Sequence, residues 1–257
     1  MAVISLNSPK SCLWKFEGTG SPATQTDSWG HANLSIYGNP GQMDPSWMTD
    51  PPGSFTASGM YGGTNDGWSH VDSSIFRIGT GDFLFVVVYY EKGLTGDSNA
   101  IMSKANWDID GNNWFNALTG GGGVGNITFR FGSSLYGTPG GVIPTGQWSM
   151  VVFERRGTAL KVWAHNLSTN TFNETPKISA TNSQSAGAND SVFMLGENEG
   201  FGKYGIQWED SCNQYLDHVI WANGVSIPDS HQRFLYNEIY NKRSDGMYYI
   251  PGGAVLL

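Results

Sequence analysis

The sequence predicts an all-β protein made of two packed β layers, with one short helix near its C-terminal end. Residues 146–166 are the clearest pattern, because apolar runs at 150–153 and 160–164 flank a polar turn at 155–158, as in a β-hairpin. A tryptophan at each end of this hairpin predicts packing against a second layer. The composition agrees: 35 glycines among 257 residues, 13% aromatic and 14% charged residues favour many short strands joined by turns.

The remaining strands are predicted from short apolar runs separated by glycine, proline and asparagine. Residues 83–90 (FLFVVVYY) form the most hydrophobic run, so we expect a central strand that is covered on both faces. A passage rich in proline and glycine at 38–70 is expected to be one long irregular loop. Further strands are expected at 13–16, 34–37, 100–104, 114–118, 127–131, 191–196 and 215–221.

One helix is predicted close to the C-terminus. Ile-Pro-Asp at 227–229 marks its start, and Phe234, Leu235 and Ile239 form an apolar stripe that ends near residue 241. No change of composition marks a second domain. We therefore expect an N-terminal arm at 1–12, one β domain at 13–243 and an apolar C-terminal tail at 244–257.

Charge and hydropathy exclude several classes of partner. The formal net charge is −8 without any basic run, which predicts no nucleic-acid partner. No apolar run approaches the roughly 20 residues of a membrane span, so no membrane partner is expected. The first residues lack the pattern of a secretory signal, which predicts synthesis in the cytoplasm.

Two cysteines, Cys12 and Cys212, each stand just before a predicted strand. If these strands pair antiparallel, their starts lie at opposite ends of the pair. We therefore expect two free thiols, with a disulfide joining them as the alternative.

Several segments recur in a fixed order over residues 13–241. They are 13–17 (LWKFE), 27–30 (DSWG) with Leu34, 81–88 (GDFLFVVV), 148–153 (WSMVVF), 157–163 (GTALKVW), 193–196 (FMLG), 216–221 (LDHVIW) and 234–237 (FLYN). This ordered set resembles the laminin-G-like, or concanavalin A-like, jelly-roll domain, and especially its pentraxin-related branch. The resemblance implies a two-sheet antiparallel jelly-roll sandwich, in agreement with the composition. Residues 166–185 depart from the family as an insertion, and the arm and the tail lie outside it.

The resemblance also implies a calcium site at a sheet edge. The matching positions are Asp27 and Asp217, with Asn33 as a supplementary ligand, and carboxylate and amide oxygens suit this cation. In the alternative interpretation, Asp27 caps its own turn and Asp217 binds backbone amides. Asp108, Asp110 and Asn112 are the ligands of a second, looser candidate calcium loop, with an ordinary Asx-turn as the alternative interpretation.

Exposed aromatic side chains suggest sugar binding, because their faces stack on pyranose rings. Tryptophans in predicted strands are expected in the core, whereas tryptophans in loops are candidates for a ligand site. Two glutamates after a strand would complete a polar pocket. The candidate ligand-binding residues are therefore Trp47, Trp68, Trp107, Trp114, Glu197 and Glu199.

Catalysis by a glycosidase requires two close carboxylates. Asp108 and Asp110 alternate correctly, but they lie in a turn and no glutamate follows, so we expect no enzymatic activity. The absent catalytic pair, the lack of a signal or disulfide pattern, and the extra arms favour a structural or recognition protein. We expect a virion (phage) decoration or appendage protein on the particle surface, contacting other subunits through arm and tail.

Two alternatives stay open. One is a soluble carbohydrate-binding module, either calcium-dependent or not, and surface glycans would also suit the virion interpretation. The other is a glycan-cleaving enzyme.

Overall fold

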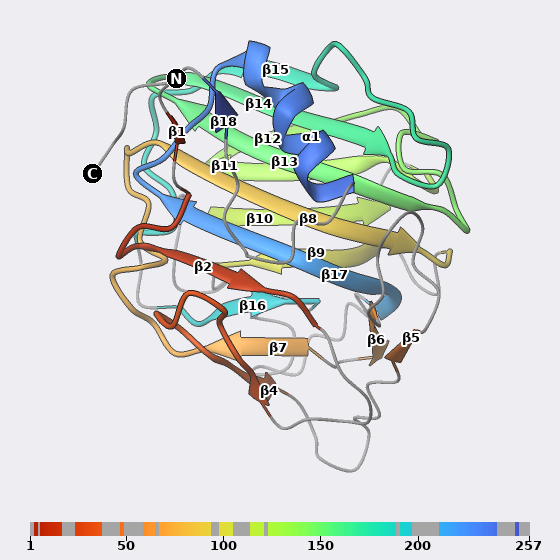
Figure 1. Cartoon of the computed structure of the whole chain (residues 1–257), viewed down its shortest axis with the longest axis horizontal. Coiled ribbons are helices and arrows are strands. Elements are labelled where there is room, and N and C mark those ends of the chain that lie inside the picture. The colour runs from red at the N-terminus through yellow and green to blue at the C-terminus, as the bar shows by residue number, and fades with distance from the viewer. Residues whose placement is uncertain are drawn as a thin grey trace.

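The computed structural model is a sandwich of two antiparallel sheets with a helix on one of them (Figure 1). We call the sheet that carries the helix the front sheet and the other the back sheet. The all-β class, the two antiparallel sheets and the single short C-terminal helix are confirmed. The structure describes residues 3–4, 6–16, 24–37, 47–48, 59–64, 67–93, 98–104, 114–120, 123–188, 191–196, 211–240 and 250–251.

The front sheet contains the hairpin and the strongly apolar strand predicted from the sequence. β2 (Ser11–Trp14) pairs with one of its central strands, β17. The other strands, in spatial order, are β15 (Ile178–Thr181), β14 (Ala159–Asn166), β13 (Trp148–Arg156), β8 (Phe83–Glu91), β17 (Ser211–Asn223), β6 (Gly59–Thr64) and β5 (Trp47–Met48).

The back sheet has eight strands and lies behind the front sheet in Figure 1. Its order is β12 (Ser134–Gly137), β11 (Ile127–Gly132), β10 (Trp114–Gly120), β9 (Ser98–Ser103), β16 (Phe193–Leu195), β7 (Gly67–His70), β4 (Leu34–Tyr37) and β3 (Thr24–Gln25).

The main core lies between the two sheets and is dominated by aromatic rings. Phe76 and Phe193 stack with centroids 4.2 Å apart, and Trp221 of the front sheet meets Phe115 of the back sheet edge-on at 5.6 Å. Such pairs stabilise the sandwich beyond their buried area, by roughly 0.5–1.5 kcal/mol each. Alternate residues of each strand therefore point inward, and the others form the two outer faces.

A second apolar layer covers the outer face of the front sheet. Helix α1 (Gln232–Tyr240), preceded by the 3₁₀ turn η1 (Asp229–His231), lies across β13 and β14 (Figure 1). Leu235 and Ile239 of α1 pack with Val86 and Val88 of β8 in one buried cluster. Strand β8 is thus covered on both faces, as predicted from its continuous apolar run.

The predicted stripe of α1 needs one correction. Leu235 and Ile239 are buried, but Phe234 is 43% exposed and Tyr236 is buried in its place. A step of about 100° per residue turns Phe234 away from the face that Leu235 and Ile239 share. Tyr236 lies close to that face and packs against the front sheet.

The passage 38–70 is also corrected, because it contains three strands where one long loop was expected. β5 and β6 pair with each other in the front sheet, and β7 joins β4 to β16 in the back sheet. β5 has only two residues, and β6 and β7 begin with glycine, so the sequence carried little β signal there.

The predicted arm and tail meet each other. β1 (Val3–Ile4) pairs antiparallel with β18 (Ile250–Pro251), apart from both sheets. Leu6 of the arm is buried in the outer apolar layer. The two chain extensions are therefore brought together at one place on the sandwich.

The prediction that Cys12 is a free thiol is confirmed. β2 and β17 pair antiparallel with Cys12 opposite Trp221, whereas Cys212 stands near the start of β17. Cys12 is free, and burial raises the pKa of its thiol. In the described part of the chain, no helix is long and apolar enough to cross a membrane.

The insertion at 166–185 joins the edges of the two sheets. Its strand β15 extends the front sheet beside β14, and Asn182 then donates from Nδ2 to the hydroxyl of Tyr136 on β12 of the back sheet at 2.8 Å. Gln184 Oε1 accepts from Ser133 N at 2.9 Å and lies against Gly132, where a Cβ would come within 2.3 Å of it. Gly132 also has a φ of 63°, so this close approach requires glycine.

Candidate functional site

Most of the predicted ligand-binding residues cannot be placed on a surface. Only the backbone of Trp47 (β5) and Trp114 (β10) is described. The candidates that fall outside the described residues are Trp107, Asp108, Asp110, Asn112, Glu197 and Glu199.

Trp68 is corrected from a loop position to the core. It lies on β7, is 1% exposed, and meets Phe16 edge-on at 6.0 Å. Its ring is therefore not available to stack on a sugar. The tryptophans that the sequence assigned to the core are buried, as predicted: Trp14, Trp148, Trp163 and Trp221.

The predicted calcium ligands are held by other contacts. Asp27 Oδ1 accepts from Leu13 N and Trp29 N, and Oδ2 accepts from His31 N and Ala32 N, at 2.7–3.0 Å. Four backbone donors occupy the roughly four lone-pair sites of a carboxylate. This geometry matches the alternative in which Asp27 caps its own turn, and it does not fit a cation at Asp27.

Asn33 and Asp217 complete the predicted set. Asn33 Oδ1 accepts from Asp27 N at 2.9 Å, while Asp217 Oδ1 accepts from both His218 N and His218 Nδ1. Asp217 Oδ2 is buried and has no hydrogen-bond partner among the described residues. Within the described ranges no three His, Cys, Asp or Glu side chains are grouped to hold a metal, so calcium stays an untested prediction.

The outer face of the back sheet presents a continuous row of side chains, one from each of its eight strands. Direct cross-strand pairing links neighbours in this row, and its members alternate with the inward-facing core residues. We call it the outer row. Its members, from β3 to β12, are Thr24, Ser35, Ser69, Met194, Ser103, Asn116, Arg130 and Leu135.

Asn116 and Arg130 are the polar centre of the outer row. Asn116 on β10 lies opposite Arg130 on β11, and its own strand neighbours, Phe115 and Ala117, face the core. Asn116 is 3% exposed, and its Oδ1 has no hydrogen-bond partner among the described residues. Burial lowers the pKa of the Arg130 guanidinium. Leaving the buried Asn116 Oδ1 without a hydrogen bond costs free energy of folding. A hydrogen bond from a ligand or a water molecule would remove that cost.

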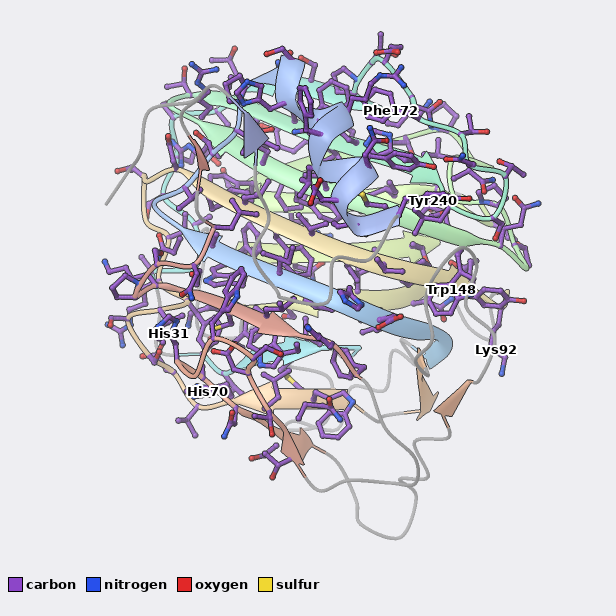
Figure 2. The ribbon with its side chains drawn as sticks, in the orientation of Figure 1. His31, His70, Lys92, Trp148, Phe172 and Tyr240 are labelled. Carbon is purple, nitrogen blue, oxygen red and sulfur yellow. The ribbon has the colours of Figure 1, made fainter. Side chains whose placement is uncertain are left out.

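The outer face of the front sheet differs because α1 and the arm close it. Its polar groups serve that packing: Glu154 holds the start of α1, and His165 is buried beside Phe172, with ring centroids 4.5 Å apart. Phe172 lies beside α1 and Tyr240 is the last residue of α1 (Figure 2), and Tyr236 of the helix contacts both rings. Among the described residues, the polar centre of the outer row is not covered by this helix, although Met194, Ser103 and Asn116 are buried there.

A third polar group is sealed inside the sandwich. Glu91 of β8 accepts from Asn99 Nδ2 at 2.7 Å, from Thr119 Oγ1 at 2.7 Å and from the Tyr89 hydroxyl at 2.8 Å. All four side chains are fully buried. This network links the front sheet to β9 and β10 of the back sheet, and it is a structural group because no part of it reaches the outer row.

Sequence reasoning missed Asn116 and Arg130, although a signal for them existed. Both lie in strands where apolar residues alternate with others, WFNALTG and ITFRFG. This alternation places every second residue on the outer face. The tryptophans predicted to bind ligand were instead loop residues, where aromatic side chains were expected to be exposed.

The fold is that of a two-sheet, lectin-like β-sandwich. No family model matches the sequence, and no curated protein matches it. Solved structures do match the fold. Domain 4 of AbnA, a GH43 extracellular arabinanase from Geobacillus stearothermophilus, in complex with arabinotriose, aligns with a TM-score of 0.56 at 16% identity, covering 90% of this chain and 97% of that one.

Two further structures align over 89–90% of this chain at 12% identity. Trypanosoma rangeli sialidase in complex with sialic acid has a TM-score of 0.59, and this chain covers 32% of it. An arabinofuranosidase complexed with arabinofuranosyl-alpha-1,2-xylobiose has a TM-score of 0.58, with 52% covered. This chain thus spans about a third of the sialidase and half of the arabinofuranosidase.

These comparisons correct the expectation that the chain is not an enzyme. Its fold occurs in part of a sialidase, in part of an arabinofuranosidase and in a domain of an arabinanase, all of them named as glycan-cleaving enzymes. The lack of a recognisable carboxylate pair in the sequence was therefore insufficient ground for a non-enzymatic assignment. At 12–16% identity the likeness itself shows the fold alone.

Proposed function

We propose that this chain binds carbohydrate at the outer face of the back sheet, beside Asn116 of the outer row. The observation that carries the proposal is the buried Oδ1 of Asn116, an acceptor without a described partner at the centre of a polar row. Sugar hydroxyls supply such donors, and serine, threonine and asparagine side chains are suitable partners for them.

One solved structure supports this proposal more directly than the others. Domain 4 of AbnA was solved with arabinotriose, and this chain covers 97% of it. The correspondence therefore extends over a whole domain that carries a bound sugar.

The proposal is tested on a glycan array that includes arabinotriose and sialyllactose, followed by titration calorimetry on any ligand found. Asn116→Leu removes the acceptor and should lower affinity at least tenfold. Asn126→Leu is the matched control, because Asn126 is equally buried and its Oδ1 also has no described partner, yet it lies outside the outer row. Absence of binding at high protein concentration, or equal binding by Asn116→Leu, would refute the proposal.

Glycan cleavage is the second candidate function, favoured by the fold shared with the sialidase and the arabinofuranosidase. The carboxylates that would be tested are Asp108 and Asp110, which lie outside the described residues. Incubation with arabino-oligosaccharides and sialyllactose, followed by chromatography of the products, decides this point. Cleavage that persists in a double Asp→Asn variant would remove both carboxylates from the mechanism.

We also propose the more specific predictions made from the sequence. These are membership of the laminin-G-like, pentraxin-related branch and a role as a virion decoration protein on a particle surface. They also include contacts with other subunits through the arm and the tail, and calcium binding. The pairing of β1 with β18 supports a joint contact, because one partner would meet both chain ends at once. Light scattering with and without residues 1–5 tests self-association, and titration with calcium tests the metal. A monomer with unchanged fold after truncation, and no heat of calcium binding, would count against them.

A further inference from the structure

β12 is the edge strand of the back sheet, so one side of its backbone has no neighbouring strand in the described part of the chain. A two-residue turn at 132–133 joins it to β11, and just beyond its other end Thr138 N donates to Ile127 O. Because backbone groups along an edge strand point alternately toward and away from the neighbouring strand, the N–H and C=O groups of Leu135 and Gly137 point away from β11. Both residues are exposed, and among the described residues these groups have no hydrogen-bond partner.

This free part of the edge is bounded on both sides. On one side, Ser133 N already donates to Gln184 Oε1 at 2.9 Å. On the other side, Pro139 has no N–H, and its C=O accepts from Thr138 Oγ1 at 3.1 Å. The free edge therefore consists of two residues, which offer two N–H donors and two C=O acceptors to another strand.

The side chains of β12 do not oppose pairing with another strand. Its sequence, SLYG, has no charged residue and no proline, whereas many natural edge strands are protected by a lysine, a proline or a bulge. Leu135 is 58% exposed, and a Cβ at Gly137 would meet no atom within 4 Å. A leucine of a neighbouring strand could therefore lie over this glycine on the outer face of the sheet.

The two boundaries favour a second copy of the same strand as the partner. If Leu135 lies opposite Gly137 of the other copy in an antiparallel pair, the two donors and two acceptors of each copy form four hydrogen bonds. Ser133 then lies opposite Pro139 of the other copy, and neither residue has an N–H without a partner. A shift of the register by two residues in either direction would lose two of the four bonds, because it places Leu135 opposite Pro139 or Gly137 opposite Ser133.

We infer that β12 pairs antiparallel with β12 of a second copy of this chain, with the two-fold axis at Tyr136, so that the two back sheets join into one. This contact goes beyond the proposed carbohydrate binding, and it involves neither the arm nor the tail. Four main-chain hydrogen bonds make a small contact, so the dimer is weak and reversible, with a dissociation constant on the order of 100 µM.

Sedimentation equilibrium of the full chain, from about 1 µM to about 1 mM, measures this dimer. Leu135→Lys brings two like charges to the contact and should raise the dissociation constant at least tenfold. Val71→Lys is the matched control, because Val71 is 73% exposed and follows β7, which four strands separate from β12 in the back sheet. It adds the same charge and should change the dissociation constant less than twofold.

Hydrogen exchange of the wild type tests the contact without a substitution. A peptide that covers β12 should exchange several times more slowly at about 1 mM than at about 10 µM, whereas a peptide that covers β15, the edge strand of the front sheet, should not change. A monomer at 1 mM would overturn the inference, and so would concentration-dependent protection of β15 in place of β12. Equal weakening of the dimer by both lysine variants would reduce the effect to overall charge, and a dimer that neither variant weakens would place the contact elsewhere; each result would overturn the inference as well.

Discussion

Gln232, the first residue of α1, donates a hydrogen bond from its side-chain Nε2 to Oε2 of Glu154 on β13, at 2.8 Å. The other oxygen of Glu154 accepts from Ile227 N at 3.2 Å. Glu154 is 2% exposed, so one buried carboxyl fixes both the start of the helix and the segment that leads into it. Burial is the main reason that its pKa is raised from 4.5 to about 7.

This raised pKa predicts a loss of stability with rising pH. Between pH 4.5 and 7 the folded chain keeps a proton on Glu154 that the unfolded chain releases, so the free energy of unfolding falls as pH rises, by about 3 kcal/mol in total. Glu154→Gln cannot ionise. Urea denaturation at pH 4.5 and 8 should show this variant gaining about 3 kcal/mol relative to the wild type. A constant difference between the two proteins at both pH values would contradict the prediction.

His165 predicts the opposite slope. Desolvation lowers its pKa from 6.5 to about 3, and Nδ1 already accepts from Asn173 N at 3.1 Å. Below pH 6.5 the unfolded chain binds a proton that the folded chain does not, so stability falls with falling pH, by about 2 kcal/mol between pH 8 and 5. His165→Phe should remove this loss while keeping a ring beside Phe172.

Together the two groups predict that the free energy of unfolding of the wild type changes little between pH 4.5 and 6.5. Over this range the folded chain holds one extra proton on Glu154 and the unfolded chain holds one extra proton on His165, so the two effects cancel. Stability of Glu154→Gln should rise with pH in this window, and stability of His165→Phe should fall. Parallel profiles of both variants would show that neither group titrates as its burial implies.

Asp27 predicts a structural role that does not depend on calcium. Asp27→Asn keeps one acceptor oxygen for the four backbone donors, so about two N–H groups lose their partner, at roughly 1–3 kcal/mol each. We expect a loss of about 2–4 kcal/mol, equal with calcium and with a chelator. Asp229→Asn is the control, because Asp229 is half exposed and pairs with Lys161 at the surface, and it should cost less than 1 kcal/mol. A loss at Asp27 that appears only with calcium would restore the metal interpretation.

The sequence predicted the architecture where the pattern was long and local. The nine-residue strand β8 and the hairpin of β13 and β14 could be read directly, because a continuous apolar run and a polar turn are strong signals. The two-residue strands β3 and β5 could not, since their pairing depends on neighbours far along the chain. Asn116 and Arg130 were missed for a similar reason: each is an ordinary polar residue in a strand until the register places them side by side.

Asn182, within the insertion at 166–185, links the edges of the two sheets. Its Nδ2 donates to the Tyr136 hydroxyl and to Phe131 O on the back sheet, while its Oδ1 accepts from Gln184 N at 2.7 Å. Asn182→Ala leaves these buried and partly buried groups without this partner and should lower the free energy of unfolding by about 2–3 kcal/mol. Tyr136→Phe removes only one of the three contacts and should cost about 1 kcal/mol. Because Asn182 joins two sheet edges, hydrogen exchange should rise in both β12 and β15; a rise in β15 alone would mean that the insertion does not link the sheets.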